Sequence, residues 1–288
     1  MDVRQTPEYA NYLKLLGWET EKIKGGQVFI KKFPLIGSII KVQRTLPPIP
    51  FTAIERIAKK VRAFQITIDP GFDPKVLTEN GSEKYIKNYQ KFRYSVPQIS
   101  FIPTKTLVLD IDKTEENILE SFSKNKRRDV RAALRGNLII KEGSDKEYID
   151  LKKKILLKKF ILPFGIDSEI QPLYQAFSPE KIKILIAYHQ NQPVAGTIIL
   201  FQPPKAYYWS AAATKEGKKL LAPTLLVWEA IKIAKQKGCT RFDLEGIYDD
   251  RFPKTKNRLG FSKFKEGFGG REIIYPPTLI KTKIFFPL

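Results

Sequence analysis

The chain has 288 residues, 42% of them hydrophobic and 12% aromatic, which is enough to bury a large core in one large domain or in two of average size. Lysines and arginines number 51 against 30 acidic residues. The formal net charge of +21 favours polyanionic partners such as RNA, phosphorylated metabolites or an anionic membrane face, the alternative being a lysine-rich surface that only keeps the protein soluble.

Several classes of protein are excluded by what the sequence lacks. No window approaches the ~18 uninterrupted apolar residues of a spanning helix, and residues 1–5 lack a signal-peptide core, so we expect a cytoplasmic protein. Cys239 is the only cysteine, which excludes an intrachain disulfide and a cysteine metal cluster. The only histidine, His189, lies in a polar turn, so a Ser-His-Asp or Cys-His mechanism is not indicated. We expect neither a metal nor a cofactor.

The first half of the chain alternates short strands and helices. Thr52 is expected to cap a helix, because its hydroxyl can accept a bond from a free backbone amide and Glu55 completes a capping box three residues later. The patterns predict helices at Thr6–Leu16, Thr52–Arg62 and Ser82–Tyr89, and strands at Val28–Lys31, Ile39–Gln43, Phe64–Pro70 and Thr106–Asp110.

The most basic part of the chain follows and should form a helix. Arg127 and Arg131 would lie one turn apart, so that their guanidiniums repeat along the helix and can hold successive phosphates. The alternative is a solvated face whose apolar side, Val130, Ala133 and Leu134, belongs to the core. We expect phosphates of a nucleic acid to be held by the basic residues of this helix: Lys124, Lys126, Arg127, Arg128 and Arg131.

The second half changes to a pattern of longer strands. Tyr207 and Tyr208 alternate along one of them, so one should point away from the core and could present a hydroxyl to a substrate. The patterns predict strands at Asn137–Ile140, Ile182–Tyr188, Pro193–Phe201, Lys205–Ala211 and Arg241–Glu245, and helices at Asp145–Phe160, Ser168–Phe177 and from Pro223 to Gly238.

The stretch from Leu259 to Arg271 is rich in phenylalanine, lysine and glycine. Alternation from Phe261 to Glu266 predicts a strand that ends at glycines. Lys265 near such a glycine-bounded strand end is well placed to meet an anion. The alternative is an edge hairpin with solvated lysines.

The order of these elements defines the expected fold. A strand pair, a third strand, a long helix and a further strand are the order of a GNAT-like α/β domain, the fold of the acyl-CoA N-acyltransferases, and the first half repeats a similar alternation. We expect an α/β protein with two GNAT-like domains, each a mixed sheet flanked by helices. The domains should be residues 1–140 and 141–271, with the tail 272–288 packing back on the first.

Two motifs carry a resemblance to a known family. The strand residues Phe242-Asp243-Leu244-Glu245-Gly246-Ile247, taken with Leu259-Gly260-Phe261-Ser262-Lys263-Phe264-Lys265-Glu266-Gly267-Phe268-Gly269-Gly270, resemble the FemABX family of non-ribosomal peptidyl transferases. The run Lys126-Arg127-Arg128-Asp129-Val130-Arg131-Ala132-Ala133 and the opening Gly17-Trp18 are similar to that family too.

The resemblance implies transfer of an amino acid from aminoacyl-tRNA to an amine of a peptidoglycan precursor, by a monomer with possible peripheral contact with the anionic inner membrane face. Lys265 and Phe264 would lie at the transfer site. A fixed cation agrees with this chemistry, because aminolysis of an ester creates an oxyanion and needs no nucleophilic residue. The residues implied to contact the acceptor are Tyr207, Tyr208, Phe242, Asp243, Lys41 and Arg44.

The sequence also departs from the family pattern. Arg44 is followed by Thr45-Leu46-Pro47-Pro48, where family members often carry Arg-Gly-Pro, and Phe242 lacks the hydroxyl of a family tyrosine. No paired heptads between Thr214 and Gly270 could form the long helical arm of larger members, which indicates the compact form.

Two other functions compete with this interpretation. An acyl-CoA-dependent N-acyltransferase needs a glycine-rich turn to hold a pyrophosphate, but the turn before the long helix, residues 216–223, has one glycine and a proline without an amide hydrogen. A non-catalytic RNA-binding protein would use only the basic helices.

Overall fold

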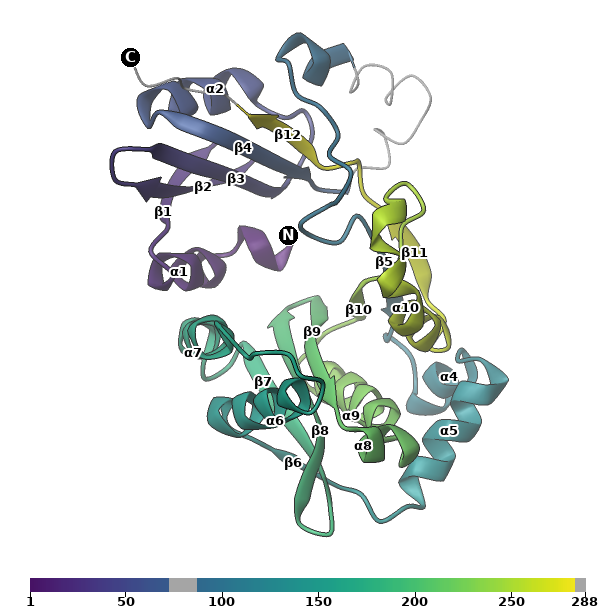
Figure 1. Ribbon diagram of the computed structural model, residues 1–288. Coiled ribbons are helices and arrows are strands. Elements are labelled where there is room, and N and C mark those ends of the chain that lie inside the picture. The colour runs from purple at the N-terminus through teal and green to yellow at the C-terminus, as the bar shows by residue number, and fades with distance from the viewer. Residues whose placement is uncertain (73–86, 283–288) are drawn as a thin grey trace. The chain divides into compact units, whose positions relative to one another are not determined.

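Residues 1–72 and 87–282 are described here from a computed structural model (Figure 1). They form two compact units. The first unit consists of the described residues of Met1–Lys105, Tyr248–Arg258 and Ile273–Leu288. The second consists of Thr106–Ile247 and Leu259–Glu272.

The first unit is a mixed sheet with strand order β1-β2-β3-β4-β12. Strands β3 and β4 are parallel and are joined by helix α2, whereas the other neighbours are antiparallel. Helix α2 buries Phe51, Ile54 and Ile57 in the core on one face. The elements are η1 (Val3–Gln5), α1 (Pro7–Leu15), β1 (Glu19–Ile23), β2 (Gly26–Phe33), β3 (Gly37–Thr45), α2 (Phe51–Lys60), β4 (Ala63–Pro70), η3 (Pro253–Arg258) and β12 (Leu279–Thr282).

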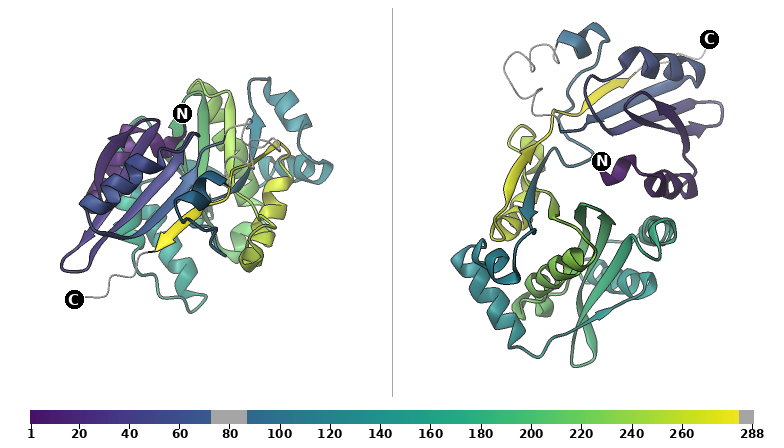
Figure 2. Two further views of the ribbon diagram at one scale, coloured as in Figure 1. Left: turned by 90° about the horizontal axis from the view of Figure 1, so that it is seen from above. Right: turned by 180° about the vertical axis from the view of Figure 1, so that it is seen from behind.

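The second unit contains a sheet of order β11-β5-β10-β9-β8-β7-β6. Helix α9 connects the parallel strands β9 and β10 and packs with α5 on one face, while α6 and α7 cover the other (Figures 1 and 2). The strands are β5 (Lys105–Asp110), β6 (Ile139–Glu142), β7 (Ile182–His189), β8 (Gln192–Gln202), β9 (Lys205–Ala213), β10 (Arg241–Gly246) and β11 (Arg271–Ile274). The helices are α4 (Glu115–Glu120), α5 (Lys124–Leu134), α6 (Asp145–Leu157), α7 (Ile166–Phe177), α8 (Lys215–Lys219), α9 (Ala222–Gln236) and α10 (Leu259–Glu266).

Each unit therefore contains a parallel strand pair joined by a helix inside an otherwise largely antiparallel sheet, which confirms the mixed α/β class. The units divide the chain at positions that differ from those expected. Residues 106–140 lie in the second unit, because β5 pairs with β10 and α5 packs against α9. Residues 248–258 lie in the first unit. The tail returns to the first unit, where β12 pairs with β4.

The largest error of the sequence analysis concerns the expected strand at Phe261–Glu266. These residues form helix α10. Phe261, Phe264 and Phe268 lie three and four residues apart, which is the spacing of one helix face, although alternation with the intervening polar residues indicated a strand. The rings of Phe264 and Phe268 lie 5.3 Å apart at their centroids, and Phe268 is fully buried. Packing of these two rings against each other at helical spacing thus overrides the strand pattern.

Smaller differences concern helix ends. The helix expected to begin at Thr52 begins at Phe51, and its N-cap, Pro50, has no side chain to accept a bond. Thr6, the first residue of the helix expected at Thr6–Leu16, is the N-cap of α1, with its Oγ1 3.2 Å from the backbone nitrogen of Tyr9. Leu134, which the alternative interpretation of this helix placed in the core, is 51% exposed at the end of α5. Most of the helix predicted at Ser82–Tyr89 lies outside the described residues.

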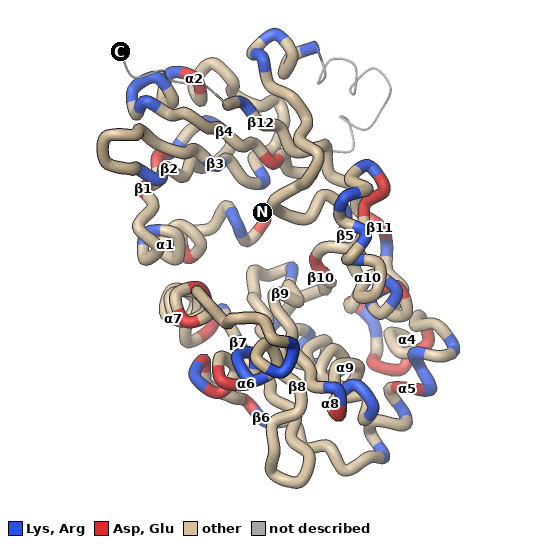
Figure 3. The backbone as a smooth tube through the Cα atoms, viewed as in Figure 1, with Lys and Arg blue, Asp and Glu red and all other residues tan. Residues whose placement is uncertain are grey.

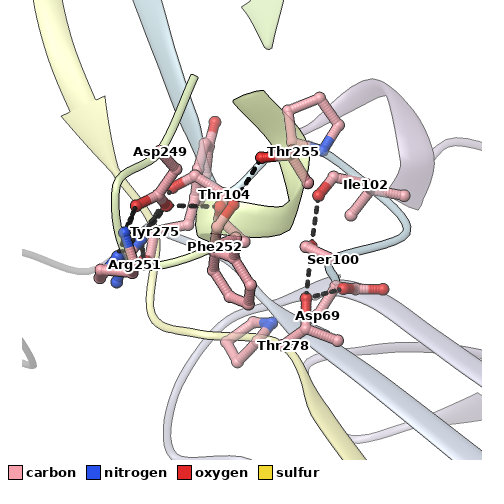
Figure 4. Close-up of polar contacts among 12 residues, drawn as sticks. Asp69, Ser100, Ile102, Thr104, Asp249, Arg251, Phe252, Thr255, Tyr275 and Thr278 are labelled. Carbon is pink, nitrogen blue, oxygen red and sulfur yellow. Dashed lines mark hydrogen bonds and ion pairs between the residues drawn. The ribbon is translucent and has the colours of Figure 1, made fainter. Parts of the chain in front are cut away.

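Polar contacts join three distant segments of the first unit (Figure 4). Thr104 donates its hydroxyl to Asp249 Oδ2 at 2.5 Å, and Arg251 donates to both oxygens of the same carboxylate at 2.7–3.2 Å. Arg251 also donates to the carbonyl oxygen of Tyr275 at 3.0 Å. Burial raises the pKa of Asp249, but the hydrogen bonds from Arg251 and Thr104 outweigh burial and hold the pKa below its usual range.

We expect Arg251→Met to lower the free energy of unfolding by about 1–2 kcal/mol, because it leaves the buried Asp249 carboxylate without its cation. The loss should be smaller than for a fully buried pair, since the Arg251 side chain is 36% exposed. The stabilisation is present at neutral pH and is lost as pH falls through the lowered pKa of folded Asp249. Urea unfolding at decreasing pH should therefore show the difference from wild type shrinking.

Lys256→Met is the matched control, since Lys256 is an exposed lysine of the same η3 segment. It should leave the unfolding free energy unchanged. Equal losses in both variants, or a loss for Arg251→Met that stays constant into acid, would contradict a stabilising ion pair.

Candidate functional site

The two parallel strands of the second unit part in the middle of the sheet. Strands β9 and β10 pair only from Arg241–Lys205 to Asp243–Tyr207. Beyond this point β9 continues along β8 and β10 continues along β5. The register of β10 shifts between Asp243 and Gly246, and Glu245 has a left-handed φ of 59°. Bulges of this kind occur next to active sites, and ligands of α/β sheets bind at the carboxyl ends of strands that diverge.

Asp243 is the buried charged group at this point, with 2% of its surface exposed. Its Oδ1 accepts bonds from the Thr106 hydroxyl at 2.6 Å and from the Glu245 backbone nitrogen at 2.9 Å, and Lys205 Nζ lies 3.7 Å from Oδ2. Burial, and then the nearby Glu245, raise the pKa of Asp243, whereas Lys205 and Thr106 oppose this. A carboxyl with a raised pKa at a strand end is characteristic of functional sites.

The aromatic residues expected to face a substrate are all buried. Tyr207 and Phe242 have no exposed surface and Tyr208 has 6%. Phe242 and Tyr208 belong to the core beneath α9. Both faces of the sheet are covered by helices, so the expectation that one tyrosine hydroxyl would face outward is wrong. Burial raises the pKa of Tyr208 above its usual value, which makes its hydroxyl a weak acid.

Helix α10 brings Lys265 to the end of β10. Lys265 Nζ donates to the carbonyl oxygen of Gly246 at 2.7 Å and lies 5.0 Å from the centroid of the Phe261 ring. Phe264 is half-buried and packs on the core of the unit. Lys263 is exposed, because two residues along a helix correspond to about 200° of rotation. The structure thus brings the Lys265 ammonium to the place where the sheet opens.

A second lysine reaches the same helix from α5. Lys126 is 8% exposed, and its Nζ lies 4.3 Å from the Phe264 ring centroid, 4.7 Å from that of Phe268 and 3.4 Å from Thr224 Oγ1 in the first turn of α9. A Cβ on Gly267 would lie 2.8 Å from Lys126 Cε, so this glycine allows the close packing. Burial lowers the pKa of Lys126, although Asp129 opposes this.

Lys126 was expected among the phosphate ligands on the surface of α5, but it is buried beside α10. Lys126 lies four and seven residues before Val130 and Ala133, which are both buried. The apolar stripe of α5 therefore runs through Lys126, and this spacing was the available signal.

The other basic residues of α5 divide into two groups. Arg127 is half-buried, and its Nη1 donates to the carbonyl oxygens of Glu120 and Phe122 at 2.8 and 2.7 Å. Three side chains are exposed at spacings of four and three residues, which puts them on one face of the helix. This basic face consists of Lys124, Arg128 and Arg131.

Lys41 and Arg44, the two residues of the first unit that were expected to bind substrate, both contact aromatic side chains of that unit. Lys41 is half-buried and its Nζ lies 4.5 Å from the Trp18 ring centroid. Burial lowers the pKa of Lys41, and Asp69 opposes this. Arg44 is 4% exposed and stacks 3.4 Å from the centroid of the Tyr275 ring. Arg44 is thus a packed residue, whereas Lys41 remains partly accessible.

Within residues 1–72 and 87–282, no helix combines the length and apolarity needed to cross a membrane. The same residues contain no group of three or more histidine, cysteine, aspartate or glutamate side chains that could hold a metal ion.

We expect Lys126→Met to leave the free energy of unfolding at neutral pH unchanged or higher, because methionine fills similar space without a buried charge. Since folding lowers the pKa of Lys126, the folded wild type binds fewer protons than the unfolded chain and becomes more stable as pH rises. The gap between variant and wild type should therefore close in alkaline solution, as measured by urea unfolding.

Lys124→Met, at an exposed position of the same helix, should have the same free energy of unfolding as the wild type at every pH. A clear loss of stability for Lys126→Met at neutral pH would mean that the ring and hydroxyl contacts outweigh the cost of burying the ammonium.

Known proteins resemble this chain in sequence and in fold. Residues 177–276 match the model of the FemAB family. The lipid II:glycine glycyltransferase of Staphylococcus aureus is 27% identical in an alignment that covers 93% of this chain and 85% of that protein. The crystal structure of FemX has a TM-score of 0.76 at 18% identity and covers 98% of this chain and 92% of its own. A tandem GNAT protein from the clavulanic acid biosynthesis pathway has a TM-score of 0.55 at 11% identity, with coverage of 89% and 78%, which confirms the expected GNAT-like fold. The chain therefore resembles the FemAB family, whose model matches residues 177–276.

Proposed function

We propose that this protein is an aminoacyltransferase that moves an amino acid from aminoacyl-tRNA to an amine on the stem peptide of a peptidoglycan precursor. Its similarity to a lipid II:glycine glycyltransferase supports the reaction class and the acceptor. The observation that carries the proposal is the Lys265 ammonium, which α10 holds against the Gly246 carbonyl where β9 and β10 part. A fixed cation at a strand end suits a reaction that passes through an oxyanion.

In the proposed reaction the acceptor amine attacks the ester carbonyl of the aminoacyl group. A C–N bond forms, the ester C–O bond breaks, and the proton lost by the amine is taken up by the leaving ribose oxygen. Lys265 stabilises the negative charge on the tetrahedral intermediate and on the leaving oxygen. The rings of Phe264 in α10 and of Phe268 just after it contact the buried Lys126 and keep this helix in place, so Lys126 acts as a positioning residue.

The basic face of α5, formed by Lys124, Arg128 and Arg131, is the proposed contact for tRNA phosphates. The three exposed cations repeat along one helix face, and such contacts supply affinity without reading sequence. Arg127 is not part of this basic face, because it is half-buried and its Nη1 donates to the carbonyl oxygens of Glu120 and Phe122.

An acyl-CoA donor is disfavoured by the turn before α9. Its single glycine, Gly217, is buried, and a Cβ there would lie 2.3 Å from the carbonyl oxygen of Val194. This glycine thus serves packing within the protein. Pro223, in the first turn of α9, has no amide hydrogen to give a phosphate.

Lys265→Met should lower the transfer rate about a hundredfold or more, the scale of losing one oxyanion donor, with little change in acceptor affinity. The assay incubates the protein with lipid-linked or UDP-linked muropeptide and a mixed pool of charged tRNAs, and mass spectrometry detects a gain of one amino-acid residue. Acetyl-CoA in place of charged tRNA should give no acetylated product.

Lys263→Met is the internal control, since Lys263 lies on the exposed side of the same helix. We expect a loss of only a few-fold, because no reacting group lies near it in the proposed site. Equal activity of the two variants, or unfolding of Lys265→Met by circular dichroism, would remove the catalytic role of Lys265.

The tRNA contact makes a separate prediction. Changing Arg128 and Arg131 together to Glu should weaken tRNA binding and reduce the slope of log affinity against log salt by about one to two, because each phosphate contact releases roughly one counterion. Filter binding at several salt concentrations measures both quantities.

The matched control reverses two exposed lysines of α8, Lys218 and Lys219, in the same unit. The control should lower affinity less and leave the slope nearly unchanged. An unaltered slope in the α5 variant would identify its basic face as merely solvated.

A further inference from the structure

The connection between α6 and α7 exposes a run of large apolar side chains. Within residues 157–165, here called the apolar loop, five side chains are at least half exposed. Single exposed apolar residues are ordinary on protein surfaces, but a contiguous group marks a surface that binds something. The five are Leu157 at 55%, Phe160 at 99%, Ile161 at 50%, Leu162 at 66% and Phe164 at 84%.

The backbone holds Phe160 in an unusual conformation. Ile161 N donates to Leu156 O at 3.0 Å and Phe160 N donates to Leu157 O at 3.0 Å, which is the Schellman pattern that ends a helix. The residue at the left-handed position of this pattern is normally glycine, yet Phe160 occupies it with φ 57°. Phe160 is almost fully exposed, so no packing within the protein explains a bulky ring at this place.

The surroundings of the apolar loop are basic. Residues 151–165 contain five lysines and no acidic residue: Lys152, Lys153, Lys154, Lys158 and Lys159. Lys153 pairs with Asp167 at 2.7 Å, and Lys154, Lys158 and Lys159 are exposed. Figure 3 shows this concentration of basic residues at the end of α6. Exposed aromatic and aliphatic side chains beside lysines match the boundary between anionic headgroups and acyl chains.

We propose that the apolar loop docks this protein on the surface of an anionic phospholipid bilayer. Phe160, Leu162 and Phe164 enter the boundary between headgroups and acyl chains, while Lys158 and Lys159 contact the phosphates. A second copy of the chain is a poorer occupant, because it would bring two equally basic loops together. The inference does not rest on the proposed transferase activity, and it would bring the second unit to the surface at which a lipid-linked acceptor resides.

Vesicle flotation with the full chain tests this docking. The protein should float with vesicles of phosphatidylcholine and phosphatidylglycerol, bind about tenfold or more weakly to phosphatidylcholine alone, and be released partly by salt. Phe160→Ser with Phe164→Ser should lower binding to the anionic vesicles about tenfold or more, since both rings lose their apolar contact. Lys158→Glu with Lys159→Glu should lower it similarly and flatten the salt dependence.

Two further variants separate docking from folding. Phe160→Gly suits the left-handed backbone, so its melting temperature should be equal to or above that of wild type while its vesicle affinity falls. Phe101→Ser is the matched control, because Phe101 is a 61% exposed phenylalanine of the first unit, and it should leave vesicle binding unchanged.

Three results would overturn the proposal. One is undiminished flotation of the Phe160→Ser, Phe164→Ser double variant. Another is equal binding of the wild type to neutral and anionic vesicles. The third is concentration-dependent dimerisation in sedimentation that the double variant abolishes, which would identify a second copy of the chain as the occupant. None of these measurements depends on transfer activity. A failure of the docking proposal can therefore be distinguished from a failure of the proposed function.

Discussion

The divergence of β9 and β10 after Asp243 is the constraint on which the second unit depends. A strand that leaves its neighbour frees backbone groups, and buried groups of this kind need other partners. The Gly246 carbonyl receives a bond from Lys265, and the Glu245 amide donates to Asp243. The polar groups of the candidate site are thus the ones that replace interrupted sheet pairing. The site consequently lies on rigid elements, which suits a reaction that needs fixed charges.

Several charges of this protein are kept where burial disfavours them. Burial lowers the pKa of Lys126 and raises that of Asp243 in the second unit. In the first unit burial raises the pKa of Asp69, which accepts a bond from Thr278 at 2.6 Å. Such groups cost free energy relative to apolar packing, so their presence indicates either function or fixed geometry. Lys126 fixes geometry, because it lies on α5 and contacts both α9 and α10.

Exposed basic residues of the second unit occur in two different surroundings. In α5 they form a face of exposed cations on an otherwise packed helix, and around the apolar loop they accompany exposed aromatic rings. The first arrangement suits the phosphate backbone of a nucleic acid, because cations alone provide affinity for such a backbone. The second suits a bilayer, because cations and apolar side chains are needed together. The same net charge therefore supports two different surfaces within one unit.

The sequence by itself determined the elements whose hydrophobic period is unambiguous. The hairpin of β7 and β8, strand β9 and helix α9 were all predicted, as were the mixed α/β class and the resemblance to the FemAB family, because their patterns are long and local. Only the tertiary structure decided α10, where alternation with polar residues indicated a strand but the phenylalanines have helical spacing. It also decided that Tyr207 and Tyr208 are both buried and that Arg44 stacks on Tyr275. These outcomes depend on which distant segment covers each side chain, and no local pattern carries that information.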